Sequence, residues 1–195
     1  MKYSLSELMH RVLELLDENE KLIEERMEFG EACADLRDLI RVVIPGVARD
    51  VILDATLHQI DDCRHTDTKP VPTACGEGVY RLPLPEGFLR LVNFRMNLWP
   101  RGVKSPLAWG GEAHLLRNMK LAGRPRRAPA VVINCRGDRS ELEIFGAESG
   151  DFVAEFDYLE EPVIVGGFIE LPPRQVAEIC DKTAEKISAL SKNYN

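Results

Sequence analysis

The sequence predicts an α+β fold: a helical bundle formed by helices from both ends of the chain, with a β-rich insertion that is a small sandwich or a meander. Apolar residues recur at helical spacing in the N-terminal and C-terminal parts of the chain. Between these parts, residues 80–103 (YRLPLPEGFLRLVNFRMNLWPRGV) show the two-residue period of a half-buried strand. With 195 residues and 45% hydrophobic content, the chain can bury one good core.

The first predicted helix has a clear start signal. Ser4 and Glu7 have the spacing of a capping box, which satisfies free N–H groups at a helix start. The apolar stripe that follows consists of Leu5, Leu8, Met9, Val12, Leu15 and Leu16. Residues 14–31 are strongly acidic, and their carboxylates include Glu24, Glu25 and Glu28. This composition is typical of a solvated helix end or link, and the alternative is a specific acidic binding face.

A second helix is predicted from Asp35 to about Thr56. Its apolar stripe consists of Leu36, Leu39, Ile40, Val43, Val47, Val51 and Ile52. Because proline removes a helix N–H and clashes with the preceding turn, we expect the helix to kink or restart at Pro45. Residues 61–78 have no apolar period and contain two prolines and two glycines, which predicts a long loop.

The opening strand of the β-rich part shows its alternation most clearly after Leu89. On one parity lie Arg90, Val92, Phe94, Met96 and Leu98, and the other parity turns polar at Asn93, Arg95 and Asn97. The segment ends in Trp99-Pro100-Arg101-Gly102. We expect Trp99 to lie at a strand end or sheet edge, where a partner could cover it.

The remaining elements follow the same signals. A short helix is predicted over residues 112–119, followed by a basic run at 120–127 that includes Arg124, Arg126 and Arg127. Three strands are predicted at 130–135, 141–145 and 152–159, the last with Phe152, Ala154, Phe156 and Tyr158 on one face. Pro172-Pro173 announces the closing helix. Its stripe consists of Val176, Ile179, Cys180, Ala184, Ile187 and Leu190.

These elements predict one compact unit with four parts. Residues 1–60 form the N-terminal helices, residues 61–79 a loop, and residues 80–165 the β-rich insertion. Residues 166–195 form the C-terminal helix, which packs on the N-terminal helices.

The charge and composition exclude several classes of protein. A formal net charge of −7 argues against general nucleic-acid binding, which needs a basic surface, but is compatible with a protein that surrounds DNA without holding it. No apolar run approaches the roughly 20 residues of a membrane span, so we expect no membrane partner. The N-terminus lacks the order of a signal peptide, which predicts a protein made in the cytoplasm.

No catalytic or metal-binding motif is present. The five cysteines are scattered and odd in number, which favours reduced thiols. Cys63, His65 and Cys75, with His58 nearby, are the nearest approach to a metal site, but the paired spacing of structural zinc ligands is missing. Neighbouring acids at residues 61, 62 and 67 are interpreted as hydrated loop carboxylates. We therefore expect no catalytic residue, no cofactor and no bound metal.

The order of elements resembles that of the head-to-tail connector, or neck ring, proteins of tailed phages. In pattern it is closest to the connectors of short-tailed crAss-like phages and to the tail-tube adaptors of other podoviruses. The most specific similarity runs from Leu84-Pro85 to Val103. The segments SELMHRVLELLDEN and DLIRVVIPGVARDVIL also look similar.

The resemblance implies a noncatalytic virion protein: a ring subunit, expected to be a dodecamer, that bridges the portal and the tail and lines the DNA exit channel. Its partners would be further copies of itself, the portal protein, and tail or further neck proteins, with genomic DNA passing through without specific binding. The location implied is the virion neck, after assembly in the cytoplasm of a bacterial host.

A ring of this kind needs two complementary surfaces on each subunit. We expect these from the acidic residues 14–38, with Glu24, Glu25 and Glu28, and the basic residues 120–139, with Arg124, Arg126 and Arg127. Trp99 and Arg101 are predicted interface anchors, because their residue types are enriched at hot spots. Two alternatives remain: a protein-interaction adaptor outside any virion, and a metal-assisted hydrolase with its site in residues 61–75.

Overall fold

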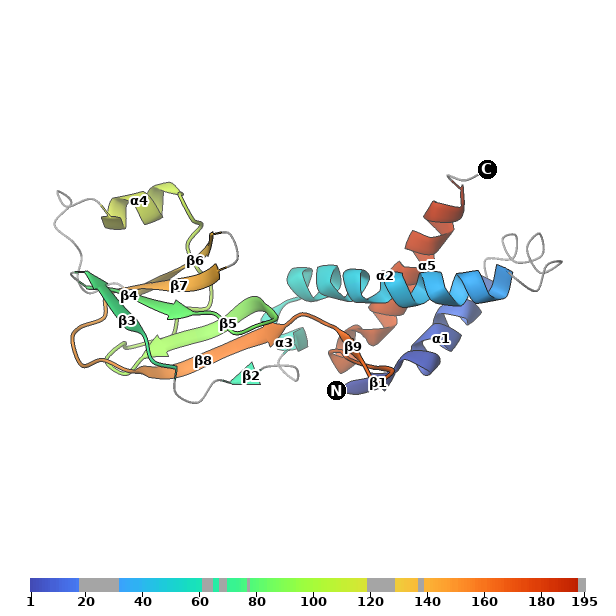
Figure 1. The fold of residues 1–195 in the computed structure, drawn as a ribbon, viewed down its shortest axis with the longest axis horizontal. Helices are drawn as coiled ribbons and strands as arrows, with labels where there is room; N and C mark the ends of the chain where they lie inside the picture. The colour runs from blue at the N-terminus through green and yellow to red at the C-terminus, as the bar shows by residue number, and fades with distance from the viewer. Residues whose placement is uncertain are drawn as a thin grey trace. The chain divides into compact units, whose positions relative to one another are not determined.

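The computed structural model describes residues 1–17, 32–60, 65–66, 70–76, 78–118, 129–136 and 139–192. The chain is a mixed α+β protein with helices α1 to α5 and several antiparallel sheets (Figure 1). It divides into a helical unit, Met1–Cys63 with Glu161–Asn195, and a β unit, Arg64–Glu160. The sequence predicted a single compact unit. The chain instead forms two, because its buried apolar residues fall into separate clusters.

The helical unit is built on α1 (Leu5–Asp17), α2 (Ala32–Asp54) and α5 (Val176–Lys192). One core cluster contains buried residues from all three helices, including Leu8, Ile44 and Ile179. Two short elements complete the helical part: α3 (Leu57–Ile60) and the 3₁₀ helix η2 (Pro173–Gln175). The predicted start of the first helix after Ser4 and the proline-led closing helix are both confirmed.

Helix α2 continues through Pro45 as one element, so the predicted restart at this residue is wrong. Proline leaves the carbonyl of Arg41 without a helical N–H donor. Buried Ile44 and Val47 on either side of the proline hold both halves of the helix against the same core.

A small antiparallel sheet joins the start of the chain to the segment before α5. It contains β1 (Lys2–Ser4), β10 (Phe168–Glu170) and β9 (Ile164–Val165), in that order. Ile169 points into the helical core at 1% exposure, whereas the cross-strand pair Val165 and Phe168 is exposed. The backbone N–H of Leu5 donates to the carbonyl of Gly167 at 2.9 Å, which ties the start of α1 to the β9–β10 turn.

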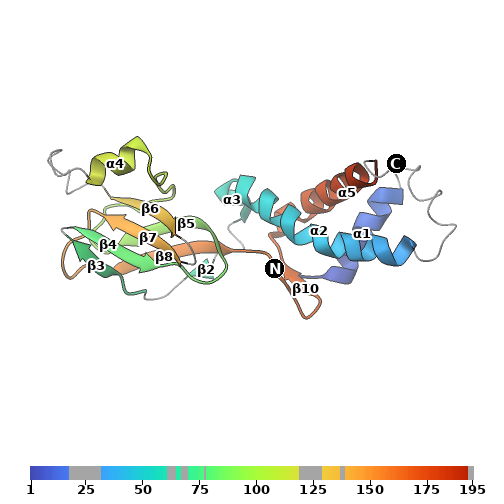
Figure 2. The same ribbon diagram turned by 45° about the horizontal axis from the view of Figure 1, so that its top comes forward.

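The β unit contains two sheets that share one core (Figure 2). The strands of the first sheet are, in order, β2 (His65–Thr66), β8 (Val153–Glu160) and β5 (Phe88–Met96). The strands of the second sheet are β3 (Thr73–Gly76), β4 (Val79–Pro83), β7 (Arg139–Phe145) and β6 (Ala130–Arg136). Phe94, Phe156 and Leu142 are fully buried between them.

Two short strands and one helix modify the predicted outline. Residues 61–78 were predicted as a loop, but β2 pairs with β8 and β3 pairs with β4, so the β unit begins earlier than residue 80. The predicted short helix is present as α4 (Glu112–Asn118). The three predicted later strands correspond to β6, β7 and β8 with small shifts of their ends.

Bulges interrupt the alternation in the central strand pair. In β5, Leu91 and Val92 are both buried, because Val92 is an extra residue between the pairs Leu91–Tyr158 and Asn93–Asp157. A second bulge, in β8, falls between Val153 and Glu155. The predicted single face of β8 is therefore wrong: Phe152 is 60% exposed, while Phe156 is fully buried.

Candidate protein-docking groove

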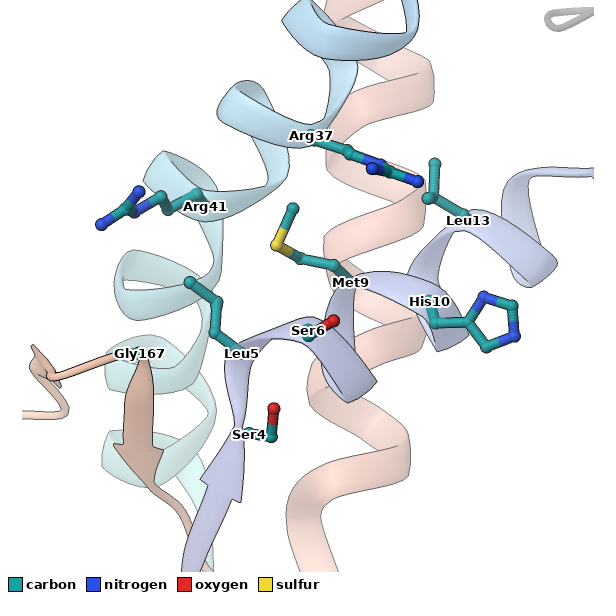
Figure 3. A pocket seen from close by; sticks show the side chains of 9 residues that line it. All are labelled: Ser4, Leu5, Ser6, Met9, His10, Leu13, Arg37, Arg41 and Gly167. Atoms are coloured by element: carbon teal, nitrogen blue, oxygen red, sulfur yellow. The ribbon is translucent and has the colours of Figure 1, made fainter.

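An open hollow of about 440 Å³ lies on the helical unit between α1 and α2 (Figure 3). We call it the α1–α2 groove. Its lining residues come from α1, α2 and the end of β1, with one residue from the β9–β10 turn: Ser4, Leu5, Ser6, Met9, His10, Leu13, Arg37, Arg41 and Gly167.

Helical geometry explains the apolar floor of the groove. Leu5, Leu8, Val12 and Leu16 form the fully buried stripe of α1. Met9 and Leu13 each follow a stripe residue by one position, so they lie about 100° round the helix at the edge of the core. Both are half-buried and pack against the core cluster. They leave a shallow apolar surface on which another side chain can pack.

Two arginines line the groove from the α2 side. Arg37 and Arg41 are four residues apart, so they lie on the same face of the helix, next to buried Ile40 and Ile44. Both are exposed. Figure 3 shows Arg37 extending toward Leu13 and Arg41 extending in the opposite direction. Neither forms an ion pair with any residue in the described ranges of the chain.

On the α1 side, a histidine completes the polar border. His10 Nε2 lies 3.2 Å from Glu14 Oε1, and both side chains are mostly exposed. Ser4 and Ser6 add hydroxyl groups at the N-terminal end of the helix. The groove thus combines an apolar floor with the guanidinium group of Arg37, and Arg41 lies at its border. This arrangement suits a segment with carboxylates and at least one apolar anchor.

A second polar cluster lies in the β unit, beneath α4. Glu143 of β7 is 5% exposed and accepts hydrogen bonds from Arg81 Nη2 at 3.1 Å and Asn134 Nδ2 at 3.3 Å. His114 Nε2 lies 3.3 Å from the other carboxylate oxygen. The backbone N–H of Gly110 donates to His114 Nδ1, so the neutral ring carries its proton on Nε2 and donates it to Glu143. This buried cluster fixes α4 to the sheet.

The structure places the predicted interface anchors differently from one another. Trp99 is 5% exposed; its ring meets Phe94 edge-on at 5.7 Å, and Nε1 donates to the carbonyl of Gly146 at 3.0 Å. The expectation that a partner covers Trp99 is therefore wrong, because the core of the β unit already does so. Arg101 is exposed and remains available for contact.

The remaining predicted interface residues lie outside the described part of the chain: Glu24, Glu25, Glu28, Arg124, Arg126 and Arg127. Cys63 and the acids at 61, 62 and 67 also lie outside it. Cys75 is exposed, with Sγ 3.6 Å from the carbonyl of Thr73. Within the described residues, no three acidic, His or Cys side chains group as metal ligands would, and no helix is long and apolar enough to cross a membrane.

Sequence reasoning did not single out Arg37 and Arg41. The signal was present: both border the predicted apolar stripe of the second helix, at its edge and on one side. A helical projection would have placed them together, but only the packing of α1 beside α2 shows that Met9 and Leu13 provide an apolar floor next to them.

No protein-family model matches the chain, and no curated protein matches it significantly.

Proposed function

We propose that the protein is a noncatalytic structural subunit, a head-to-tail connector of a short-tailed phage. In this proposal, copies form a ring, expected to be a dodecamer, that bridges the portal and the tail and lines the DNA exit channel. The terminal helices form the bundle of each subunit, and the β-rich insertion is its second part. The subunits assemble in the host cytoplasm and reside in the virion neck.

The main support is the α1–α2 groove. A ring needs heterologous contacts, in which one surface of each copy meets a different surface of the next. The groove is a surface of this kind: it presents Arg37 and Arg41, without ion-pair partners in the described residues, on a chain whose formal net charge is −7. Every copy therefore carries surplus carboxylates, whose charge is complementary to the arginines of this groove on another copy.

The overall charge also fits a DNA channel. A strongly basic channel would bind the phosphate backbone and hold the genome in place. A negative subunit repels phosphate, so DNA can pass without specific binding. Of the predicted anchors, Arg101 on the β unit remains a candidate for contact with the portal or with tail proteins.

The proposal is tested by the mass of the purified protein, measured by light scattering, alone and after mixing with candidate portal assemblies. Electron microscopy of any particles shows whether they are rings. Rings, or monomers that become rings only on a portal, support the connector. A monomer that binds no portal overturns the connector proposal and favours the protein-interaction adaptor. Bound metal together with hydrolytic activity would favour the metal-assisted hydrolase.

Arg101→Glu tests the role of the β unit within this assembly. The side chain is exposed, so we expect the charge reversal to leave folding intact and to weaken attachment to the portal or tail. The matched control is Lys104→Glu, which makes the same charge change at another exposed position of the same unit. Equal attachment of both variants and the unchanged protein would remove Arg101 from the interface.

A further inference from the structure

We propose that the α1–α2 groove binds the acidic segment of a second copy of this chain, residues 18–31. The inference rests on the proposed ring and names the contact that closes it. The groove belongs to the described part of the chain, and its occupant is identified by the chemistry of its sequence.

The charges of the two surfaces are complementary. Residues 18–31 read ENEKLIEERMEFGE, in which glutamates outnumber the basic residues Lys21 and Arg26. Arg37 extends toward Leu13 in the groove, whereas Arg41, four residues further along α2, lines the groove and extends in the opposite direction. One carboxylate of the segment can pair with Arg37 in the groove and a second with Arg41 at its border. Glu24 and Glu28 have the same four-residue spacing.

The apolar parts are also complementary. Leu22, Ile23 and Met27 stand among the carboxylates of the segment. Met9 and Leu13 form a half-buried floor between the arginines and His10. A methionine or leucine placed on that floor would lose water contact while its neighbouring carboxylates reach the arginines. This combination of apolar anchor and charged border gives a contact both stability and register.

A charge-swap experiment tests the contact in the full chain. Arg37→Glu/Arg41→Glu reverses the charge of the groove, and Glu24→Lys/Glu25→Lys/Glu28→Lys reverses the charge of the segment. We expect each variant alone to lose the ring contact. An equal mixture of the two should restore rings, because every groove then faces a segment of opposite charge: the intact groove faces the intact segment, and the Glu-bearing groove faces the Lys-bearing segment. Light scattering distinguishes these rings from monomers.

A direct binding measurement makes the test independent of ring formation. The probe is a fluorescent peptide of residues 18–31, and the receptor is the full chain carrying the three Glu→Lys changes, whose own segment cannot compete. We expect binding that weakens with salt and becomes about tenfold weaker or more when Arg37→Gln/Arg41→Gln is added, a neutral change that gives the Lys-bearing segment of the receptor nothing to bind. Lys186→Glu, on an exposed position of α5, is the matched control and should change nothing.

Three outcomes overturn the inference. The first is that the peptide binds no better than one with Glu24, Glu25 and Glu28 changed to Gln, and the second is that the arginine changes leave its affinity unchanged. The third is that the peptide binds while the mixed variants stay monomeric, which would place the segment in the groove of its own chain. If portal-dependent rings form with both arginines reversed, the connector stands and only this contact fails. If no ring forms under any condition but the peptide binds the groove, the connector function fails.

Discussion

His114 on α4 and Glu143 on β7 form a buried pair, with Nε2 and Oε2 3.3 Å apart and both side chains 6% exposed or less. Removing the imidazole takes one donor from a buried carboxylate and leaves the Gly110 N–H without its acceptor. We expect His114→Ala to reduce the free energy of unfolding of the β unit by about 1–3 kcal/mol.

Urea denaturation followed by tryptophan fluorescence measures this change, because both tryptophans of the chain, Trp99 and Trp109, lie in the β unit. The matched control is His10→Ala, which removes an exposed histidine of the helical unit and should leave the transition unchanged. Equal stability of His114→Ala and the unchanged protein would contradict a structural role for the pair.

The two tryptophans should differ sharply in their contribution to stability. Trp99→Ala removes a buried ring and its hydrogen bond to Gly146, so we expect a loss of about 3–5 kcal/mol. Trp109 is 42% exposed, and Trp109→Ala should cost much less. The unfolding midpoint, followed by circular dichroism in the strand region, measures both. Equal losses would show that Trp99 is not the core residue described above.

Two glycines give opposite predictions for the same substitution. A Cβ on Gly46, exposed in the middle of α2, meets nothing within 4 Å, so Gly46→Ala should raise the free energy of unfolding of the helical unit by about 0.5–1 kcal/mol. A Cβ on Gly102 collides with the side-chain oxygen of Asn93, whose amide donates to Glu155 at 2.6 Å.

Gly102→Ala must therefore displace Asn93 from its hydrogen bond, and we expect a cost of about 1–2 kcal/mol. Thermal unfolding measures the melting temperatures of both variants and of the unchanged protein. We expect the highest for Gly46→Ala and the lowest for Gly102→Ala. A Gly102→Ala protein as stable as the unchanged one would mean that Asn93 moves aside without loss.

Cys180 should be protected from thiol reagents. Burial in the helical core raises the pKa of its thiol, an effect that Arg11 partly offsets. Cys75 and Cys135 are exposed. In a chain with Cys33→Ser and Cys63→Ser, we expect a chromogenic disulfide reagent to label two thiols quickly at pH 8 and the third only on unfolding. Rapid labelling of all three thiols would contradict the burial of Cys180.

The same shift has a consequence for stability. The folded pKa lies above that of the unfolded thiol, so the folded state holds its proton at a pH where the unfolded chain loses it. This contribution is complete below the unfolded pKa of about 8.5 and is lost as the pH rises through the folded pKa. The free energy of unfolding, measured by urea denaturation, should therefore fall less between pH 8 and about 10 in Cys180→Ala than in the unchanged protein.

Periodicity predicted the elements well where one face is buried throughout. The stripes of α1, α2 and α5 fall close to their predicted residues, because burial on one side fixes the period. The strands β6 and β7 were also predicted nearly in place, although both faces of each are buried. Periodicity failed at β8, because the bulge between Val153 and Glu155 interrupts the alternation and the residues from Phe156 to Leu159 are then all buried. A bulge depends on the partner strand, which no local pattern contains.

The candidate site shows the same limit. Trp99 looked available for a partner because Pro100 and Gly102 end the strand beside it, but the carbonyl that its indole reaches belongs to Gly146, far along the chain. Arg37 and Arg41 were visible as charges next to a stripe, yet their groove exists only because α1 packs beside α2. The sequence shows which aromatic and charged side chains are available for binding, but tertiary contacts decide which of these side chains are exposed.

The insertion of the β unit between the two parts of the helical unit sets the order of events during synthesis. After α2 leaves the ribosome, the roughly one hundred residues of the β unit follow, which takes about 5–20 s before α5 is made. For that interval the apolar stripes of α1 and α2 have no third helix to cover them, and by its end the β unit has all of its strands. The inserted unit is thus the first to complete its core, and the helices at the two ends are the last part of each newborn chain to be protected from aggregation.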